Sequence, residues 1–457
     1  MNETRNHRLE QAMRDAGFSQ KSLARAVRST ALRHGARVGT DHTSVARWLS
    51  GMRPRQKTPL FVAEAISQRL GRTLSPIDLG LADGPAVSHQ LGLVFNDDAD
   101  DATSTLVSLW RADLDELPTI VDSRVESAAW NESSLRWLTG ARGRLVERAT
   151  SPRVGQSDID AIKDTVEHFA QLDNKHGGGR GRRSLLRFLA DDVAPLLGGQ
   201  FGDSTRKQLF SAVAEANLLA AWMSYDSGLH GLAQRHFIQA LRLAETAGDR
   251  QLGASILSAM SHQATFLGRF REAFSLARAG LAGLGGAGTA TLRAQFHAME
   301  ARALAGQRDT RACDLALADA VREFDHRDPD ADPEWIRYFD LPELTAEIVH
   351  CERDLGRATR AVVSPVSALG HDGDTFARSD FFASLALAEA HVAAGDPEQG
   401  CIVATQALLA GSDLRSERCK AYVASLRRTL QPFADLPGVR DRLEELGQHQ
   451  AWKWMAA

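Results

Sequence analysis

From about Ser211 onward the chain repeats one short pattern, and this repeat constrains the fold more than any other feature. Each unit has a glycine-containing loop followed by small and large apolar residues at helical spacing. The small residues recur about 40 residues apart, at Ala233, Ala273, Ala312, Ala358 and Gly400. One such unit cannot bury its apolar face alone, so neighbouring units have to stack and supply the core together.

These units resemble tetratricopeptide repeats with slightly long loops, although the proline usual near the end of such a repeat is mostly absent. The resemblance implies paired α-helices stacked into a solenoid, with helices around Leu426, Phe433 and Leu443 as a C-terminal cap. Aromatic residues make up only 6% of the chain and Tyr occurs three times, which disfavours strands. The sequence therefore predicts an all-α protein.

The formal charge of the chain is unevenly distributed. Residues 1–72 contain 14 Lys and Arg against 5 Asp and Glu, a formal charge of +9, so −13 remains for the rest of a chain whose net charge is −4. A compact basic module before an acidic body suggests a polyanion as the partner of that module. The alternative is a solvated basic surface without a partner, and the residue pattern is needed to distinguish the two.

The basic module is predicted to contain a series of short helices, over 6–16, from Gln20, from Thr40 or Asp41 to Gly51, and from Leu60 to Gly71. Its segments resemble the helix-turn-helix of Xre (lambda-repressor-like) regulators. The residues that carry this resemblance are Gly17-Phe18-Ser19-Gln20-Lys21-Ser22-Leu23-Ala24 and Thr43-Ser44-Val45-Ala46-Arg47-Trp48-Leu49-Ser50-Gly51-Met52-Arg53-Pro54.

In that family the start of the second motif helix enters the major groove of double-stranded DNA, and the protein binds as a dimer. The resemblance therefore implies a homodimer that faces base edges with His42, Thr43, Ser44 and Arg47. It implies that Gln20 binds a phosphate or a base near the groove edge, and that Lys21 also contacts the DNA. It implies phosphate contacts from Arg53, Arg55 and Lys57. Val45 and Trp48 take core positions of the same helix.

One departure from the Xre pattern concerns residues 28–41, which add roughly ten residues where the family has a tight turn. This insertion carries Arg28, Arg33, His34 and Arg37. Two outcomes are open: the insertion lengthens the preceding helix and touches the DNA backbone, or it spoils the geometry of base contact.

A wider resemblance covers nearly the whole chain. It rests on three segments, which are Leu172-Asp173-Asn174-Lys175-His176-Gly177-Gly178-Gly179, Asp192-Val193-Ala194-Pro195-Leu196-Leu197 and Gly231-Leu232-Ala233-Gln234-Arg235-His236-Phe237-Ile238-Gln239-Ala240-Leu241. They resemble actinobacterial regulators that join a helix-turn-helix to tetratricopeptide repeats, a group that includes a negative regulator of Streptomyces differentiation. We expect a DNA-binding domain at 1–84, a helical linker or capping region at 85–205 and the repeats at 206–457.

The first helix of each tetratricopeptide pair lines a concave groove, and alignment on the small residues places polar and aromatic side chains there. The groove residues expected are Glu215, Trp222, Tyr225, Asp226, His262, Phe266, His297, Asp340, Glu343, Glu347, His350 and Glu389. This acidic groove is predicted to bind a basic or amphipathic peptide segment, or the basic module itself. Alternatively, Trp222 and Phe266 are inter-repeat core and the acids are merely solvated.

Other classes find little support in the sequence. It holds no HExxH, GxSxG or Walker pattern and no dinucleotide-binding fingerprint, in which GxGxxG follows a strand and opens a helix, so we expect no enzyme, no cofactor and no metal. No apolar run is long enough to span a membrane. The four cysteines, Cys313, Cys351, Cys401 and Cys419, are scattered among apolar residues and are expected to be buried free thiols of a cytoplasmic protein.

Two functions remain open. The first is a transcriptional regulator of development or secondary metabolism, whose repeats bind a peptide, protein or small-molecule effector. The second is an adaptor that acts through protein contacts and carries a degenerate helix-turn-helix.

Overall fold

The computed structural model describes residues 5–33, 36–55, 57–70, 74, 76, 78–81, 88–140, 153–179, 181–363 and 376–455. Within these ranges the regular elements are helices, and the only β-type pairing is an isolated bridge between Arg153 and Gln200. The predicted all-α class is confirmed. No helix in the described part of the chain has the length and apolar character needed to cross a membrane.

The chain divides into two compact units. Unit 1 consists of residues 1–91 together with 111–125, and unit 2 consists of residues 92–110 together with 126–457. The polypeptide therefore passes from unit 1 into unit 2, returns once, and then remains in unit 2. Each unit has its own buried core.

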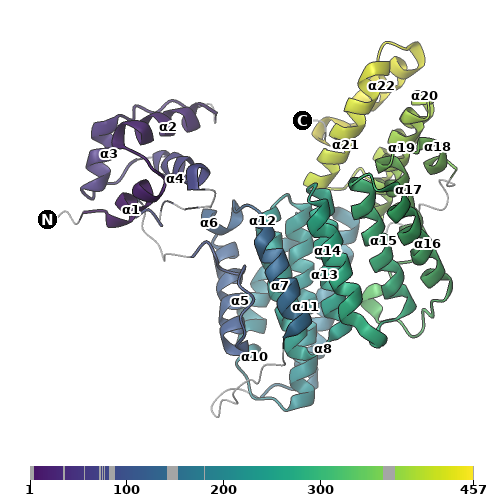
Figure 1. Ribbon diagram of the computed structural model, residues 1–457, viewed down its shortest axis with the longest axis horizontal. Coiled ribbons are helices and arrows are strands. Elements are labelled where there is room, and N and C mark those ends of the chain that lie inside the picture. Colours follow the sequence, from purple (N-terminus) through teal and green to yellow (C-terminus); the bar gives the residue numbers. More distant parts are fainter. Residues whose placement is uncertain are drawn as a thin grey trace. The chain divides into compact units, whose positions relative to one another are not determined.

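Four helices form most of unit 1: α1 (His7–Asp15), α2 (Gln20–Arg33), α3 (His42–Leu49) and α4 (Thr58–Leu70) (Figure 1). Asn6 caps α1 by accepting a hydrogen bond from the backbone N–H of Leu9. The same Asn6 side chain donates to the carbonyl of Leu79, and this bond links the residue before α1 to the segment after α4. Leu9, Leu23 and Val62 are completely buried in the shared core.

The insertion at 28–41 lengthens α2, which continues to Arg33, and its remainder runs back to the start of α3. The Arg28 guanidinium donates to the carbonyl of Thr40. Arg33 donates to the side-chain oxygen of Gln68 on α4 at 2.9 Å. The insertion therefore lengthens the preceding helix, as in the first of the two predicted outcomes, and its residues are tied to unit 1. Its contact with the DNA backbone stays a prediction. His34 lies outside the described residues.

The next helices in the chain are α5 (Ala99–Leu114), α6 (Pro118–Val121), α7 (Ser127–Thr139), α8 (Gln156–His176), α9 (Arg182–Phe188) and α10 (Ala194–Leu197), with a π-helical turn (Leu189–Val193) before α10. Asp98 caps α5 by accepting hydrogen bonds from the N–H groups of Asp100 and Asp101. In unit 2, the indole of Trp137 on α7 fills space next to Gly253 and Gly283, where any added Cβ would overlap it. This packing docks α7 on the paired helices that come next.

Unit 2 is built mainly from antiparallel helix pairs: α11 (Asp203–Asp226) with α12 (His230–Ala247), α13 (Arg250–Phe266) with α14 (Phe270–Leu284), α15 (Ala290–Gly306) with α16 (Thr310–Asp325), α17 (Leu341–Asp354) with α18 (Ala358–Ala361), and α19 (Ala377–Ala393) with α20 (Pro397–Ala410). Figure 1 shows these pairs side by side. The first helices of successive pairs contact one another, so they form one continuous layer.

The turn inside each pair has one residue with positive φ, directly before the N-cap of the second helix. These residues are Gly228, Gly268, Arg308, Gly356 and Gly395. The residues five positions later are small and buried, at Ala233, Ala273, Cys313, Ala361 and Gly400. The repeat anchors predicted at Ala312 and Ala358 were therefore misplaced by one and three residues, because spacing was counted without the turn geometry.

The last helices are α21 (Glu417–Leu430), α22 (Pro437–Gln448) and α23 (Gln450–Met455). They share a core with α19 and α20, in which Leu385, Leu426 and Leu446 are fully buried. Helix α21 packs against α19, the first helix of its pair, rather than against α20. All four cysteines are buried, as predicted.

Candidate functional sites

The start of α3 lies at the surface of unit 1, while the middle of the same helix lies in its core. Val45 is fully buried and Trp48 is 5% exposed. His42, Thr43 and Arg47 are exposed to solvent. A helix turns once every 3.6 residues, so one face takes the apolar pair and another takes Thr43 and Arg47. The core positions predicted for Val45 and Trp48 are confirmed.

Asp41 caps the first turn of α3. Its Oδ1 accepts a hydrogen bond from the Thr43 hydroxyl at 2.7 Å, and from both the backbone N–H and the hydroxyl of Ser44 at 2.8 Å. These bonds, with that from Thr43 as the largest contribution, hold the pKa of the Asp41 carboxyl well below its usual range. The hydroxyl hydrogens of Thr43 and Ser44 therefore point at Asp41, and their oxygens remain available only as acceptors.

The other predicted DNA contacts lie at the start of α2 and between α3 and α4. Gln20 and Lys21 are exposed, and so are the three basic residues Arg53, Arg55 and Lys57. Only Ser44, among the nine predicted residues, is half-buried. The sequence interpretation missed Arg25, which is also exposed one helical turn after Lys21; their i, i+4 spacing on α2 was the signal that could have found it.

In unit 2, aromatic and histidine side chains from the first helices and from α21 meet in a group that we call the ring cluster. Its members are Trp222, Tyr225, His262, Phe266, His350, Phe382 and Tyr422. The ring centroids of Tyr225 and Phe266 are 5.5 Å apart. Tyr422 comes from α21 and stacks on Phe382 at 4.6 Å. Helix α21 therefore covers part of the layer of first helices, where the sequence predicted an open groove.

The predicted acidity of that groove is wrong. Glu347 forms an ion pair with Arg302, and these residues are only 3% and 6% exposed. Glu389 pairs with Arg353 at 3.2 Å. A buried carboxylate that is already matched by a guanidinium leaves little charge for a basic peptide. The acids were predicted as solvated or peptide-binding because their arginine partners come from other helices.

Asp226 belongs to a second buried group of charges. Its carboxylate accepts a hydrogen bond from the Ser416 hydroxyl at 2.7 Å and lies 3.6 Å from Arg378 and 4.0 Å from Arg418. Arg378 also pairs at 2.8 Å with Asp173 on α8. Burial raises the pKa of Asp173 to about 6, against the opposing effect of Arg378. This charge group joins α8, α11, α19 and α21.

The glycines after α8 allow the chain there to lie close to α11. Gly177 ends α8 with a positive φ, and the N–H of Gly178 donates to Asp226 at 2.9 Å. A Cβ on Gly178 would lie 2.5 Å from the carbonyl oxygen of Met223 on α11. The glycine run is therefore a close contact between helices, and it lies within one of the segments that carry the resemblance to actinobacterial regulators.

The histidines of the ring cluster are held neutral. Burial, followed by the positive charge of nearby arginines, lowers the pKa of His262 and His350 well below the usual value. Arg302 and Arg418 contribute to the lowered pKa of both histidines. Arginines thus add to the effect of burial at both histidines, whereas the residues aligned along the groove predicted acidic surroundings.

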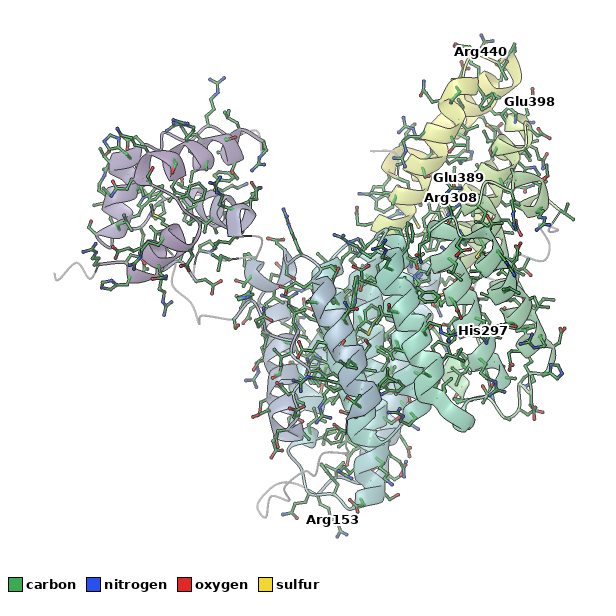
Figure 2. All side chains as sticks on the ribbon, viewed as in Figure 1. Arg153, His297, Arg308, Glu389, Glu398 and Arg440 are labelled. Atoms are coloured by element: carbon green, nitrogen blue, oxygen red, sulfur yellow. The ribbon has the colours of Figure 1, made fainter. Side chains whose placement is uncertain are left out.

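The remaining predicted groove residues lie apart from the ring cluster. His297 is half-buried with Nδ1 3.5 Å from Glu300, and Figure 2 shows it away from Glu389. Asp340 is the N-cap of α17 and accepts from the backbone N–H of Glu343. Burial raises the pKa of Glu215 to about 7. Within the described residues, no group of three or more His, Cys, Asp or Glu is arranged to hold a metal ion.

The functional candidates that sequence reasoning missed in unit 2 are cations and one aromatic residue: Arg302, Arg308, Arg353, Arg378, Arg418 and Tyr422. Arginines at buried positions of Ala-rich helices, such as Arg302, were the available signal. Nothing in the local sequence identified Tyr422, since its position depends on where α21 packs.

Residues 9–82 match a family model described as the SP15 N-terminal domain. This match begins within α1 and covers α2 to α4, a small part of the chain. No curated protein matches the chain.

Proposed function

We propose that the chain is a DNA-binding transcriptional regulator with an Xre-type helix-turn-helix in unit 1 and a tetratricopeptide-like solenoid in unit 2. In this proposal it acts in the cytoplasm as a homodimer, by binding rather than by catalysis. Its resemblance to actinobacterial regulators suggests control of development or antibiotic production, with an effector bound by unit 2.

One observation carries the proposal: the start of α3 is exposed, while Val45 and Trp48 anchor the same helix in the core. This is the arrangement that a helix needs to enter a major groove without unfolding its own domain. Exposed cations on either side of α3, including Lys21 and Lys57, supply phosphate contacts.

The Asp41 cap sharpens the expected base preference. Thr43 and Ser44 present acceptor oxygens, so they favour amino groups, which cytosine N4 and adenine N6 offer in the major groove. Arg47 keeps its guanidinium exposed, and Arg commonly binds guanine O6 and N7. The preferred half-site should therefore combine a guanine with neighbouring adenine or cytosine on the contacted strand.

Binding of the full chain to genomic DNA fragments, measured at two salt concentrations, tests the proposal. We expect a set of preferred fragments, and Arg47→Ala should weaken these by about 1–3 kcal/mol while leaving other fragments almost unchanged. Lys57→Ala is the matched control, because loss of a phosphate contact weakens all fragments alike and reduces the salt slope by about 0.9.

The competing adaptor function predicts a different result. If the helix-turn-helix is degenerate, no fragment is preferred and Arg47→Ala behaves like Lys57→Ala. That outcome, or the absence of salt-dependent binding, would reject the regulator and leave a protein that acts through protein contacts.

A further inference from the structure

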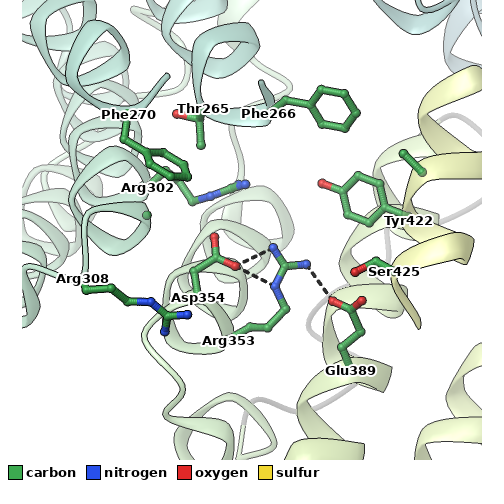
Figure 3. A pocket seen from close by; sticks show the side chains of 12 residues that line it. Thr265, Phe266, Phe270, Arg302, Arg308, Arg353, Asp354, Glu389, Tyr422 and Ser425 are labelled. Carbon is green, nitrogen blue, oxygen red and sulfur yellow. Dashed lines mark hydrogen bonds and ion pairs between the residues drawn. The ribbon is translucent and has the colours of Figure 1, made fainter. Parts of the chain in front are cut away.

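A cavity of about 450 Å³ lies in unit 2 between the layer of first helices and α21. Phe266, Phe270 and Tyr422 supply its aromatic wall. Figure 3 shows Arg302 beside Phe270, and the Arg353 guanidinium between Asp354 and Glu389. The volume lies in the range of pockets that hold small molecules.

Three buried side chains that line this cavity have a polar atom without a hydrogen-bond partner in the described protein. They are Nε of Arg302, Oγ1 of Thr265 and Oε1 of Glu389, and these residues are 6–8% exposed. Buried polar atoms are normally satisfied, and exceptions call for a physical explanation. A bound ligand would explain two of these atoms if it accepts a hydrogen bond from Nε of Arg302 and donates one to Oε1 of Glu389.

Arg308 at the edge of the cavity has a strained backbone. Its φ is 63°, at the turn position where the other four helix pairs have glycine with φ between 71° and 93°. A side chain in this conformation has an energetic cost that glycine avoids. The Arg308 guanidinium makes no hydrogen bond or ion pair with any described residue, so nothing within that part of the protein offsets the cost.

We propose that this cavity binds a small aromatic anion that also carries a hydrogen-bond donor, with Arg308 as the contact for the anionic group. The aromatic wall takes the body of the ligand, and the unpartnered oxygen of Glu389 takes the donor. Arg353 is held in place by Asp354 at 2.8 Å and by Glu389 at 3.2 Å, which leaves Arg308 as the uncommitted cation. Strain at Arg308 is retained because binding needs its charge.

This inference deepens the proposed function, because it assigns a chemical class to the effector of unit 2. The probe is 8-anilinonaphthalene-1-sulfonate, which has aromatic rings, an anionic group and an N–H donor. Its fluorescence is titrated with the full chain, with Arg308→Gly and with Arg311→Ala. The control removes an exposed charge three residues away that does not line the cavity. The titration contains no DNA, so its failure is distinguishable from failure of DNA binding.

We expect saturable binding by the wild type, at least tenfold weaker binding by Arg308→Gly, and unchanged binding by Arg311→Ala. The melting temperature of Arg308→Gly should equal or exceed that of the wild type, because glycine relieves the strained turn. Lost binding in an equally stable protein cannot result from misfolding. Equal affinity of wild type and Arg308→Gly, equal weakening by both variants, or no saturable binding by the wild type would overturn the proposal.

Competition separates the anionic group from the aromatic body. 3-Phenylpropionate has a ring and a carboxylate, whereas phenethylamine has a similar ring and an ammonium group. We expect 3-phenylpropionate to displace the probe from the wild type and phenethylamine to leave it bound. Displacement by phenethylamine alone would show that the cavity selects cations, contrary to the proposal.

Discussion

Unit 1 and unit 2 use charge in opposite ways. In unit 1, exposed cations such as Lys21, Arg25 and Arg47 remain at the surface around a mainly apolar core. In unit 2, Arg302 and Arg418 are buried and lie beside carboxylates. The cations of unit 1 thus remain accessible to solvent, whereas many charged groups in the acidic remainder of the chain form ion pairs inside the protein.

This difference shows that net charge is informative only when the charges lie at the surface. The remainder of the chain carries −13 by sequence, yet its described interior is rich in cations because acids and arginines pair across helices. A buried pair contributes little field outside, but it becomes costly when one partner is removed. The two units should therefore respond very differently to loss of a charge.

The largest expected effect comes from breaking a buried pair. Glu347→Leu leaves the Arg302 guanidinium buried without its carboxylate and should reduce the free energy of unfolding by about 3–5 kcal/mol. The double variant Arg302→Met/Glu347→Leu should recover most of this loss, because both charges are removed. Urea denaturation followed by circular dichroism measures both.

The matched control for Glu347 is Asp203→Ala. Asp203 pairs with Arg206 at 3.5 Å but its side chain is 93% exposed, so its removal should cost less than about 1 kcal/mol. If Glu347→Leu proves no more damaging than Asp203→Ala, the contrast between buried and exposed charge is wrong.

A pH-dependent effect follows from Glu215. Burial raises its pKa from an ordinary 4.5 to about 7, so the folded state holds the proton more tightly than the unfolded state. The protonated carboxyl stabilises the fold fully below pH 4.5, and this stability is lost as pH rises to about 7. Relative to Glu215→Gln, the wild type should lose on the order of 2 kcal/mol between pH 4.5 and 7.5.

Urea denaturation at both pH values, with Glu167→Gln as the exposed control, measures this effect. Glu167 lies on the solvent side of α8, so its variant should follow the wild type at each pH. Parallel pH profiles for wild type and Glu215→Gln would contradict a carboxyl buried in the uncharged form.

In unit 1, loss of the Asp41 cap should act locally. Asp41→Ala removes the acceptor for Thr43 and Ser44, and the N–H groups in the first turn of α3 should exchange with deuterium about fivefold faster. Asp41→Asn keeps an acceptor oxygen and should exchange at nearly the wild-type rate. Hydrogen exchange of the full chain, read by mass spectrometry, compares them. Unchanged exchange in the alanine variant would show that the cap does not stabilise α3.

The smallest effect on stability should come from the residue most important for the proposed function. Arg47 is exposed, and its only described side-chain hydrogen bond is a long one of 3.4 Å to the carbonyl of Thr43. Arg47→Ala should therefore change the free energy of unfolding by no more than about 0.5 kcal/mol. A larger loss in urea denaturation would mean that Arg47 supports the fold of unit 1, and DNA-binding results for this variant would need that correction.

Much of unit 1 was predictable because its signals are local. The helix start at Thr40 or Asp41, the core positions Val45 and Trp48, and the exposed face of α3 follow from contacts within about one helical turn. The structure then assigns the cap to Asp41. The approximate period of the paired helices was predictable for the same reason. The exact anchors at Cys313 and Ala361 were missed, because longer loops shift the count and only the turn geometry restores it.

The sequence by itself determined the helical class, most helix ends in unit 1 and the approximate spacing of the repeats. Only the tertiary structure decided that Glu347 meets Arg302, that Asp226 meets Arg378 and Arg418, and that Tyr422 joins the ring cluster by stacking on Phe382. The physical reason is distance along the chain. A helix and its caps depend on neighbours within a few residues. A buried ion pair between two helices forms only when tertiary packing brings the two helix faces together.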